Sequence, residues 1–368
     1  MRLERREFLR IALAASGGVL VNKLLNHPPA KALGPDLSAE SESFYTPEKE
    51  NLTILDKLGL HSTPIEGGGE RPETTIFTAI NLGINFIVAL TPSEEFLKIA
   101  SQNDLPVITR WYTKNNILNE KKFRETIKRI KKYQDYNIVI PFNEVNLLRE
   151  TGNEERTPKQ HAEEYIQALH IGKEEDCIIP ITPMSQGHGP GVIDDYIYLP
   201  EMLLELKNRI DLSLFKDNLA LCLHRYILRR GDDDFIQGIT SIYNSTVDIL
   251  NMHLPVYVTE AGLYQDRKIL YDETIVAAET VKILKLSLPS NIPVETIDLW
   301  NFSGFYQRPQ DHRVDNEDNP AFDLEPSALI DTDGRPKEAF IQIEKMVMAK
   351  KRERFMPNKQ EFLLWQPD

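Results

Sequence analysis

Short apolar runs alternate with longer amphipathic segments from about residue 52 onward. The runs are nearly continuous in Val, Ile and Leu, and they show little of the apolar–polar alternation of half-buried strands. This pattern is typical of parallel strands that are buried on both faces. Eight runs can be counted, at 57–63, 86–91, 106–112, 137–144, 177–183, 218–226, 255–262 and 296–304.

The segments between these runs predict helices, because their apolar residues recur at spacings of three and four. One helix begins with Thr157-Pro158, a capping residue followed by proline at the first helical position. Apolar faces are formed by Phe123, Ile127 and Ile130, by Ala162, Tyr165, Ile166 and Leu169, and by Phe340, Ile343 and Val347.

Alternating strands and helices over about 300 residues predict a single α/β domain, a (β/α)8 TIM barrel over residues 51–355. The competing architecture is an open doubly wound sheet. Such a sheet usually carries a Gly-rich phosphate-binding turn after an early strand, and no strand run here is followed by GxGxxG. The pattern therefore favours the barrel.

Composition narrows the function further. The net charge of −13 argues against nucleic acid as a partner, because binding a phosphate backbone needs a cationic face. The only cysteines, Cys177 and Cys222, lie in apolar runs and form no CxxC pair, which argues against a structural zinc site or a redox motif. A disulfide between the two remains open. We expect neither a cofactor nor a metal.

The first residues resemble an export signal. A basic segment with Arg5-Arg6-Glu7-Phe8-Leu9 precedes an apolar run, 11–21, that is about half as long as a membrane-spanning helix. The pattern resembles a bacterial twin-arginine signal at 1–32. It implies the twin-arginine machinery as a partner, an exported protein, and no stable membrane span after processing. An N-terminal amphipathic helix that stays attached is the alternative.

The export signal is followed by a polar, acidic stretch at 33–50, which predicts a disordered tether. At the other end of the chain, residues 356–368 are expected to form a C-terminal tail beyond the barrel.

Polar side chains gather where the predicted strands end, and barrel enzymes carry their active sites at that end. These residues are His61 on strand one, Arg110 on strand three, Asn143 and Glu144 on strand four, His224 and Tyr226 on strand six, Glu260 on strand seven and Trp300 on strand eight. Only Glu144 and Glu260 are carboxylates, and they come from strands on roughly opposite sides of the barrel. Glycoside hydrolysis needs such a pair.

Four motifs at these strand ends, Pro141-Phe142-Asn143-Glu144, His224-x-Tyr226, Val258-Thr259-Glu260 and Trp300, resemble those of clan A glycoside hydrolases, with families 5 and 39 as the nearest likeness. The stretch at 328–340 also looks like the lead into the last helix of that clan. The resemblance spans roughly residues 55–350.

The resemblance implies a role for each site residue. Glu144 would be the acid/base and Glu260 the nucleophile of a retaining enzyme that cleaves a β-linked oligo- or polysaccharide. Asn143 would hydrogen-bond the sugar 2-hydroxyl, and the Tyr226 hydroxyl would hold an oxygen of the nucleophile. Trp300 would form the platform on which a pyranose ring stacks. His224 would bind substrate or orient Glu144, or else be purely structural, and His61 is expected to support the site.

The chain departs from the clan pattern at two positions. Strand two ends in Ala89-Leu90-Thr91 without the usual arginine, and Val145 follows Glu144 where the clan has proline. Arg110 on strand three is either the replacement for that arginine or part of an ordinary ion pair.

Two other functions compete with the glycosidase. One is a non-catalytic carbohydrate-binding barrel. The other, a metal-dependent barrel hydrolase, is disfavoured because strand one carries His61-Ser62-Thr63 and not the His-x-His of a binuclear site.

Overall fold

The computed structural model describes residues 52–62, 72–111, 113–135, 137–186, 191–227, 235–263, 272–299, 329 and 335–355. The predicted export signal, the predicted tether, Trp300 and the predicted tail at 356–368 all lie outside these ranges, so those predictions stay predictions.

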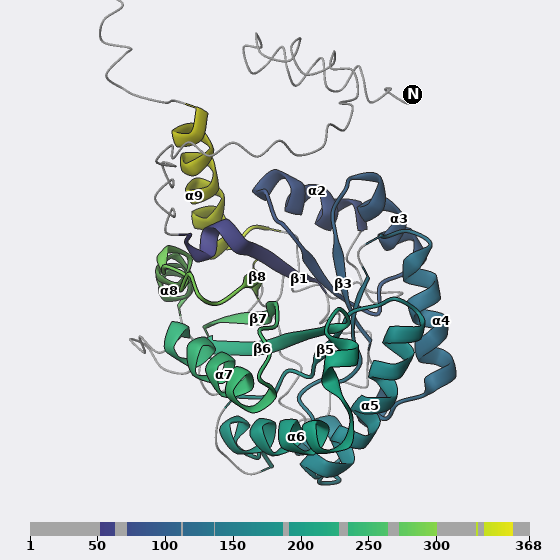
Figure 1. Ribbon diagram of the computed structural model, residues 1–368. Helices are drawn as coiled ribbons and strands as arrows, with labels where there is room; N and C mark the ends of the chain where they lie inside the picture. Colours follow the sequence, from purple (N-terminus) through teal and green to yellow (C-terminus); the bar gives the residue numbers. More distant parts are fainter. Residues whose placement is uncertain are drawn as a thin grey trace, which may run out of the picture. The chain divides into compact units, whose positions relative to one another are not determined.

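Eight parallel strands form the centre of the molecule (Figure 1). They are β1 (Leu58–Ser62), β2 (Ile87–Leu90), β3 (Val107–Arg110), β4 (Ile138–Ile140), β5 (Ile179–Ile181), β6 (Leu219–Ile227), β7 (Val256–Leu263) and β8 (Val294–Leu299). Hydrogen-bonded neighbours run in the order β4-β3-β2-β1-β8-β7-β6-β5.

The sheet closes between its two end strands. The Val139 N–H donates to the Ile178 carbonyl (3.0 Å), and the Ile178 N–H donates to the Asn137 carbonyl (2.9 Å). These bonds join β4 to the residue just before β5. The predicted (β/α)8 barrel is therefore confirmed.

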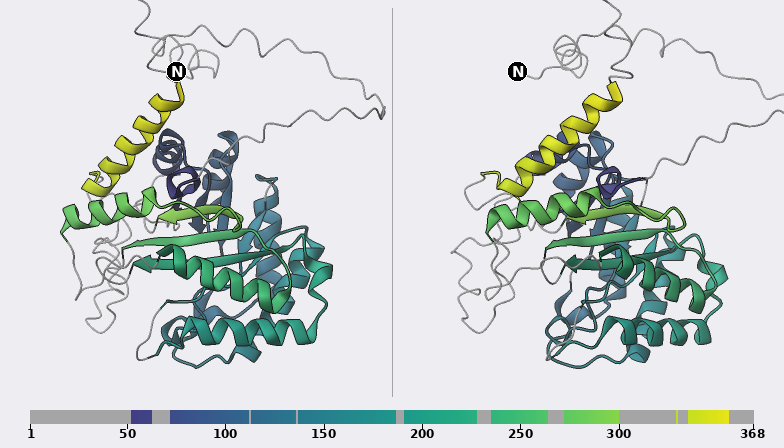
Figure 2. Two further views of the ribbon diagram at one scale, coloured as in Figure 1. Left: turned by 60° about the vertical axis from the view of Figure 1, so that its left-hand side comes forward. Right: turned by 90° about the vertical axis from the view of Figure 1, so that its left-hand side faces the viewer.

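Helices surround the strands, and each strand is followed by one helix in the part of the chain that the structure describes (Figures 1 and 2). They are α2 (Pro72–Leu82), α3 (Glu94–Gln102), α4 (Glu120–Lys131), α5 (Pro158–Glu174), α6 (Asp195–Arg209), α7 (Phe235–Leu250), α8 (Glu273–Lys285) and α9 (Glu338–Phe355). Short 3-10 turns add η2 (Ile54–Lys57), η3 (Lys114–Asn116), η4 (Leu148–Thr151) and η5 (Leu212–Phe215). None of the described helices is long and apolar enough to cross a bilayer.

The start of α5 shows how local sequence sets a boundary. The Thr157 hydroxyl accepts a hydrogen bond from the Gln160 N–H, and the Gln160 side chain accepts one from the Thr157 N–H. Pro158 occupies the first helical position, where no N–H is needed. The helix start predicted from Thr157-Pro158 is confirmed.

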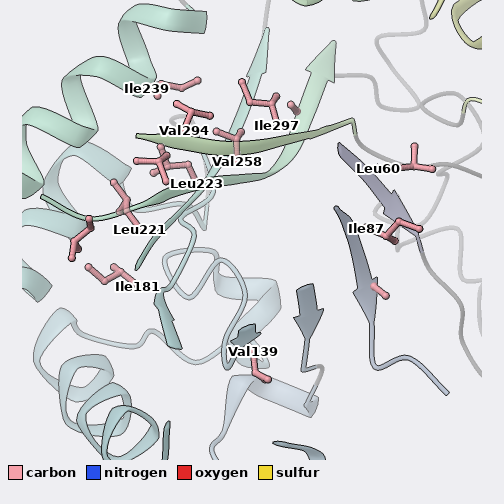
Figure 3. Close-up of a cluster of buried hydrophobic side chains, with 14 of the residues drawn as sticks. Leu60, Ile87, Val139, Ile181, Leu221, Leu223, Ile239, Val258, Val294 and Ile297 are labelled. Carbon is pink, nitrogen blue, oxygen red and sulfur yellow. The ribbon is translucent and has the colours of Figure 1, made fainter. Parts of the chain in front are cut away.

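Two layers of apolar side chains hold the barrel together. Leu221, Leu223 and Val258 point outward and pack under the helices (Figure 3). A second, smaller cluster fills the barrel interior with Val88, Ile108, Ile138, Ile140, Ala220, Cys222 and Tyr257. Full burial of such a side chain stabilises the fold by about 1.5–3 kcal/mol. The interior is thus a packed core beneath the mouth of the barrel.

Cys177 and Cys222 are both buried and both free. Cys222 lies in the interior cluster, and its sulfur is 3.0 Å from the Thr259 hydroxyl. The disulfide that the sequence left open does not form.

Strand limits differ from the sequence prediction most clearly at strand four. The predicted strand runs from 137 to 144, whereas β4 ends at Ile140. Pro141 follows at once, and proline has no N–H to donate to a ladder. Asn143 and Glu144 therefore lie in the turn after β4 and not on the strand.

Three other strands differ from their predicted limits by two residues at one end or both, and the first of them, β3, ends at Arg110 and not at 112. β5 is shorter than the run at 177–183, and β8 begins two residues before the run at 296–304. The predicted residues of strand eight beyond 299 lie outside the described part.

A bulge between β6 and β7 has the largest consequence for the site. Leu223 pairs with Val258, but His224 pairs with Glu260, so Thr259 is the extra residue. Val256 and Val258 face the helices, and strict alternation would turn Glu260 outward as well. The bulge re-aims Glu260 toward the barrel mouth beside His224.

Candidate active site

The structure brings together all the predicted site residues that it describes. They come from five places at the carboxyl ends of strands: His61 from β1, Arg110 from β3, Asn143 and Glu144 from the turn after β4, His224 and Tyr226 from β6, and Glu260 from β7. All are buried except Tyr226, which is half-buried. Trp300 lies outside the described residues. The inward direction predicted for His224 and Tyr226 is confirmed by their contacts with the glutamates.

Glu260 is held at both of its carboxylate oxygens. Arg110 Nη1 donates to Oε1, and the Tyr226 hydroxyl donates to Oε2 at 2.6 Å. These two charge-assisted contacts fix the direction of the carboxyl group. The structure thus places a guanidinium on Glu260 from β3, although strand two carries no arginine.

Arg110 is supported in turn by His61. Its Nη1 lies 3.3 Å from His61 Nε2. Burial lowers the pKa of His61 well below its usual range, and the charge of Arg110 lowers it further. The imidazole is therefore neutral, and its Nε2 accepts from the guanidinium. His61 contributes to the site by orienting Arg110.

Replacing Arg110 with Met tests this ion pair. The change leaves the buried Glu260 carboxylate without its cation, and breaking a buried pair costs about 3–5 kcal/mol. We expect the free energy of unfolding, measured with urea, to fall by that amount. Arg124→Met removes a more exposed pair with Glu174 and is expected to cost less than about 1 kcal/mol. Equal losses in the two variants would contradict a special role for Arg110.

Glu144 has a different environment. Burial raises the pKa of its carboxyl, and the charges of Arg149 and Arg110 oppose this only in part. The backbone at Glu144 has φ of 40°, a region that residues other than glycine rarely adopt. Its N–H donates to the Pro183 carbonyl at 3.0 Å, which ties the turn to the chain after β5. The carboxyl is thus suited to carry a proton.

His224 lies between the two glutamates. Its Nδ1 is 2.9 Å from Glu144 Oε1 and 3.2 Å from Glu260 Oε2. Burial lowers the pKa of His224 to about 4, with Glu260 opposing that shift and Arg110 adding to it. The ring is neutral near pH 7, and two carboxylate oxygens facing Nδ1 place its single proton there. His224 therefore links the pair without adding a charge.

The spacing of the two carboxyl groups bears on the chemistry. One oxygen of Glu144 and one of Glu260 lie within 4.8 Å of each other. Retaining glycosidases hold their carboxyl groups about 5–5.5 Å apart, and inverting ones about 6.5–9.5 Å apart to admit a water. The oxygen–oxygen limit of 4.8 Å agrees better with the shorter separation.

Glu144, His224 and Glu260 also form the only group of three metal-binding side chains found among the described residues. The donors are poorly suited to a divalent cation. Both oxygens of Glu260 already accept hydrogen bonds, and one of those comes from the fixed charge of Arg110. A second cation there would be repelled at short range. The arrangement suits proton transfer between two carboxyl groups.

Sequence analysis did not single out two loop amides that hold the site. Asn116 of η3 accepts from the Asn143 N–H (2.8 Å) and donates to the Asn143 carbonyl (2.6 Å). Gln186, after β5, accepts from the Tyr226 N–H at 2.8 Å. Both residues lie in loops, where no periodic pattern relates them to the strands that they contact.

No family model matches the chain, and no curated protein matches it by sequence. Solved structures do match it. A GH128 (subgroup II) endo-β-1,3-glucanase from Pseudomonas viridiflava is 15% identical with a TM-score of 0.50, covering 78% of this chain and 96% of that one. The corresponding GH128 (subgroup II) endo-β-1,3-glucanase from Sorangium cellulosum is 12% identical with a TM-score of 0.52, covering 78% and 97%.

A GH5_18 protein from Bifidobacterium longum subsp. infantis is 11% identical with a TM-score of 0.51, covering 80% of this chain and 78% of that one. At such low identities the likeness is one of fold. The chain thus shares the barrel of these solved proteins and carries a buried pair of glutamates at its mouth.

Proposed function

We propose that this protein is a retaining glycoside hydrolase that cleaves a β-linked oligo- or polysaccharide by double displacement. The observation that carries the proposal is the contrast between two neighbouring carboxyl groups. Both oxygens of Glu260 accept hydrogen bonds, from Arg110 and Tyr226, whereas burial raises the pKa of Glu144 and favours its protonated form. Two carboxyls with opposite environments are the usual basis for assigning acid and nucleophile.

In the first step, a Glu260 oxygen attacks the anomeric carbon and the glycosidic C–O bond breaks. Glu144 gives its proton to the departing oxygen, so the leaving group departs as a neutral alcohol. Charge moves from Glu260 to Glu144 in this step. Arg110 loses part of its interaction with Glu260 as the ester forms, and the His224 Nδ1–H can donate its hydrogen bond to the newly charged Glu144.

In the second step, the Glu144 carboxylate takes a proton from a water molecule, and the water oxygen attacks the same anomeric carbon. The ester bond to Glu260 breaks, and its carboxylate returns to the hydrogen bonds from Arg110 and Tyr226. Two inversions at one carbon give net retention.

Two residues carry proposed contacts with the sugar. The side-chain oxygen of Asn143 is buried and has no hydrogen-bond partner among the described residues, so it can accept from a sugar hydroxyl. Trp300 remains the proposed stacking platform on the strength of the family resemblance alone.

The test is the stereochemistry of the first product. The protein is incubated with a panel of β-glycosides that begins with β-1,3-glucans, because two similar solved proteins are endo-β-1,3-glucanases. We expect ¹H NMR to show the β-anomer before mutarotation. Initial release of the α-anomer would contradict retention. Binding without turnover across the panel would favour a non-catalytic carbohydrate-binding barrel.

We also propose that the protein acts after export through the twin-arginine route. The support is the Arg5-Arg6-Glu7-Phe8-Leu9 segment and the apolar run behind it. N-terminal sequencing of protein from the cell envelope and the medium tests the proposal, since a start near residue 33 is expected. Uncleaved protein confined to the cytoplasm would contradict it.

A further inference from the structure

A fully buried histidine contacts the two chain segments that hold the backbone of Glu144. His161 lies at the start of α5, where the capping box of Thr157 and Gln160 fixes the first helical turn. Its backbone N–H donates to the Thr157 carbonyl at 3.0 Å, and its side chain is buried. Neither the sequence motifs nor the proposed chemistry assigns His161 a role.

The first of its contacts is with the chain after β5. His161 Nε2 lies 3.0 Å from the hydroxyl oxygen of Thr182, which directly follows β5 and is also buried. The next residue is Pro183, whose carbonyl accepts the hydrogen bond from the Glu144 N–H at 3.0 Å. His161 is therefore bonded to the neighbour of the residue that holds the Glu144 backbone.

The second contact is with the turn after β4. The ring centroids of His161 and Phe142 are 4.9 Å apart, and the ring planes meet edge to face at 80°. Phe142 is fully buried and stands two residues before Glu144. One side chain of α5 thus contacts both segments that the hydrogen bond from Glu144 to Pro183 joins.

His161 acts as a neutral donor. Burial lowers the pKa of its imidazole to about 3, with a smaller contribution from the charge of Arg156. Its Nδ1 is buried and has no hydrogen-bond partner among the residues that the structure describes. A buried N–H without an acceptor is rare in proteins, so the single proton belongs on Nε2. Nε2 therefore donates to the Thr182 hydroxyl.

The backbone of Glu144 explains why this turn needs support from its neighbours. Its φ of 40° is strained for a residue other than glycine, and such strain persists only where the surrounding structure over-determines it. Asn116 holds the Asn143 backbone from the side of β3. His161 and Thr182 hold the chain on the side of β5. Loss of the second support would let the turn relax and move the Glu144 carboxyl.

We propose that His161 is a positioning residue for the acid step: through Thr182 and Phe142 it holds the turn after β4 in the conformation that presents Glu144. This inference rests on the proposed function, because it concerns the step in which Glu144 protonates the leaving group. His161 acts through its two contacts and not on the reacting atoms.

Thr182→Val tests the hydrogen bond, because it removes the hydroxyl and keeps the shape of the side chain. For substrates with poor leaving groups, kcat/KM is expected to fall by about 10-fold, since a misplacement of about 1 Å can cost up to about 10²-fold. Dinitrophenyl glycosides, whose leaving group needs no proton from Glu144, should keep the wild-type kcat/KM. Equal losses with both classes of substrate would overturn the inference.

Thr246→Val is the matched control. Thr246 lies on α7, is as buried as Thr182, and donates its hydroxyl to the Ile242 carbonyl at 2.9 Å. The same group is removed at a distance from the turn, so neither class of substrate should be affected. Thr182→Ser keeps the hydroxyl and should react as wild type does with both classes.

Two replacements of His161 test the same bond from the other side. The amide nitrogen of Gln reaches as far from the backbone as Nε2, so His161→Gln should retain most of the activity on poor leaving groups. The shorter His161→Asn cannot reach Thr182 and should show the loss expected of Thr182→Val. Equal activity in the two variants would mean that the bond does not position the turn.

Hydrogen exchange measured by NMR gives a readout that does not depend on turnover. In Thr182→Val, the Glu144 N–H is expected to exchange about 10-fold faster than in wild type, because the turn opens locally. The Val139 N–H, on β4 itself, should exchange as before. Equal acceleration at both amides, or none at Glu144, would overturn the inference. Failure of the proposed function would appear separately, as wild type that turns over no glycoside.

Discussion

Replacing Glu260 with glycine is expected to lower kcat on β-glycosides by about 10⁴–10⁶-fold, the scale at which loss of a nucleophile acts in other enzymes. The cavity left by the side chain lies beside Arg110 and Tyr226, whose donors then face it. Azide fits there as a small anionic nucleophile. With a dinitrophenyl β-glycoside, azide should restore turnover and give a glycosyl azide of inverted, α configuration.

Azide rescue distinguishes a variant that has lost only its nucleophile from one that has lost its folded structure. Removal of Glu260 leaves the buried Arg110 without its counter-charge, so the variant is also expected to unfold more easily. Only a folded site can be rescued by azide. Glu279→Gln is the control, since Glu279 is a buried glutamate on α8, paired with Lys282 and not with the site. A β-glycosyl azide, or full activity without azide, would remove Glu260 from the nucleophile's role.

The second large effect is expected at Glu144. General acid catalysis contributes about 10²–10⁴-fold, so Glu144→Gln should lower kcat/KM by that factor on substrates with poor leaving groups. Dinitrophenyl glycosides should still form the glycosyl-enzyme, because their leaving group departs without a proton. The covalent intermediate should then accumulate, since water has lost its base, and mass spectrometry of the denatured protein should detect it on Glu260.

The pH profile gives an independent check on the same residue. In the proposed mechanism the protonated form of Glu144 is the acid, and burial raises the pKa of this carboxyl above the usual value. The wild-type rate should therefore persist above pH 4.5 and fall as pH rises through this raised pKa. Glu144→Gln should lack that basic limb. A limb that survives unchanged in the variant would mean that another group supplies the proton.

The barrel could be predicted from the sequence because its main determinant is local. Strands buried on both faces need continuous apolar runs, and the helices that cover them need one apolar face, so the periodicity shows both directly. Phe123, Ile127 and Ile130 are all buried, as their spacing predicts. The ends of the strands are harder to predict, because a single proline at 141 stops β4 before the turn that carries Glu144.

Most of the residues that form the candidate site could also be predicted from the sequence. In a barrel, all strands end at one mouth, so polar residues at strand ends must converge whatever their separation in sequence. His224 and Glu144 are 80 residues apart and lie in contact. Asn116 and Gln186 were missed because they contact the site from loops, and loop contacts depend on the path of the chain.

The sequence by itself determined the fold class, the pair of glutamates and most of their neighbours, since periodicity and strand order suffice for these. Only the tertiary structure decided how the pair is held. Arg110 reaches Glu260 from β3 because barrel closure brings that strand end close to β7. Glu260 faces the mouth because a bulge at Thr259 reverses the alternation that Val256 and Val258 set. Pairing register and closure are long-range properties, so no local pattern encodes them.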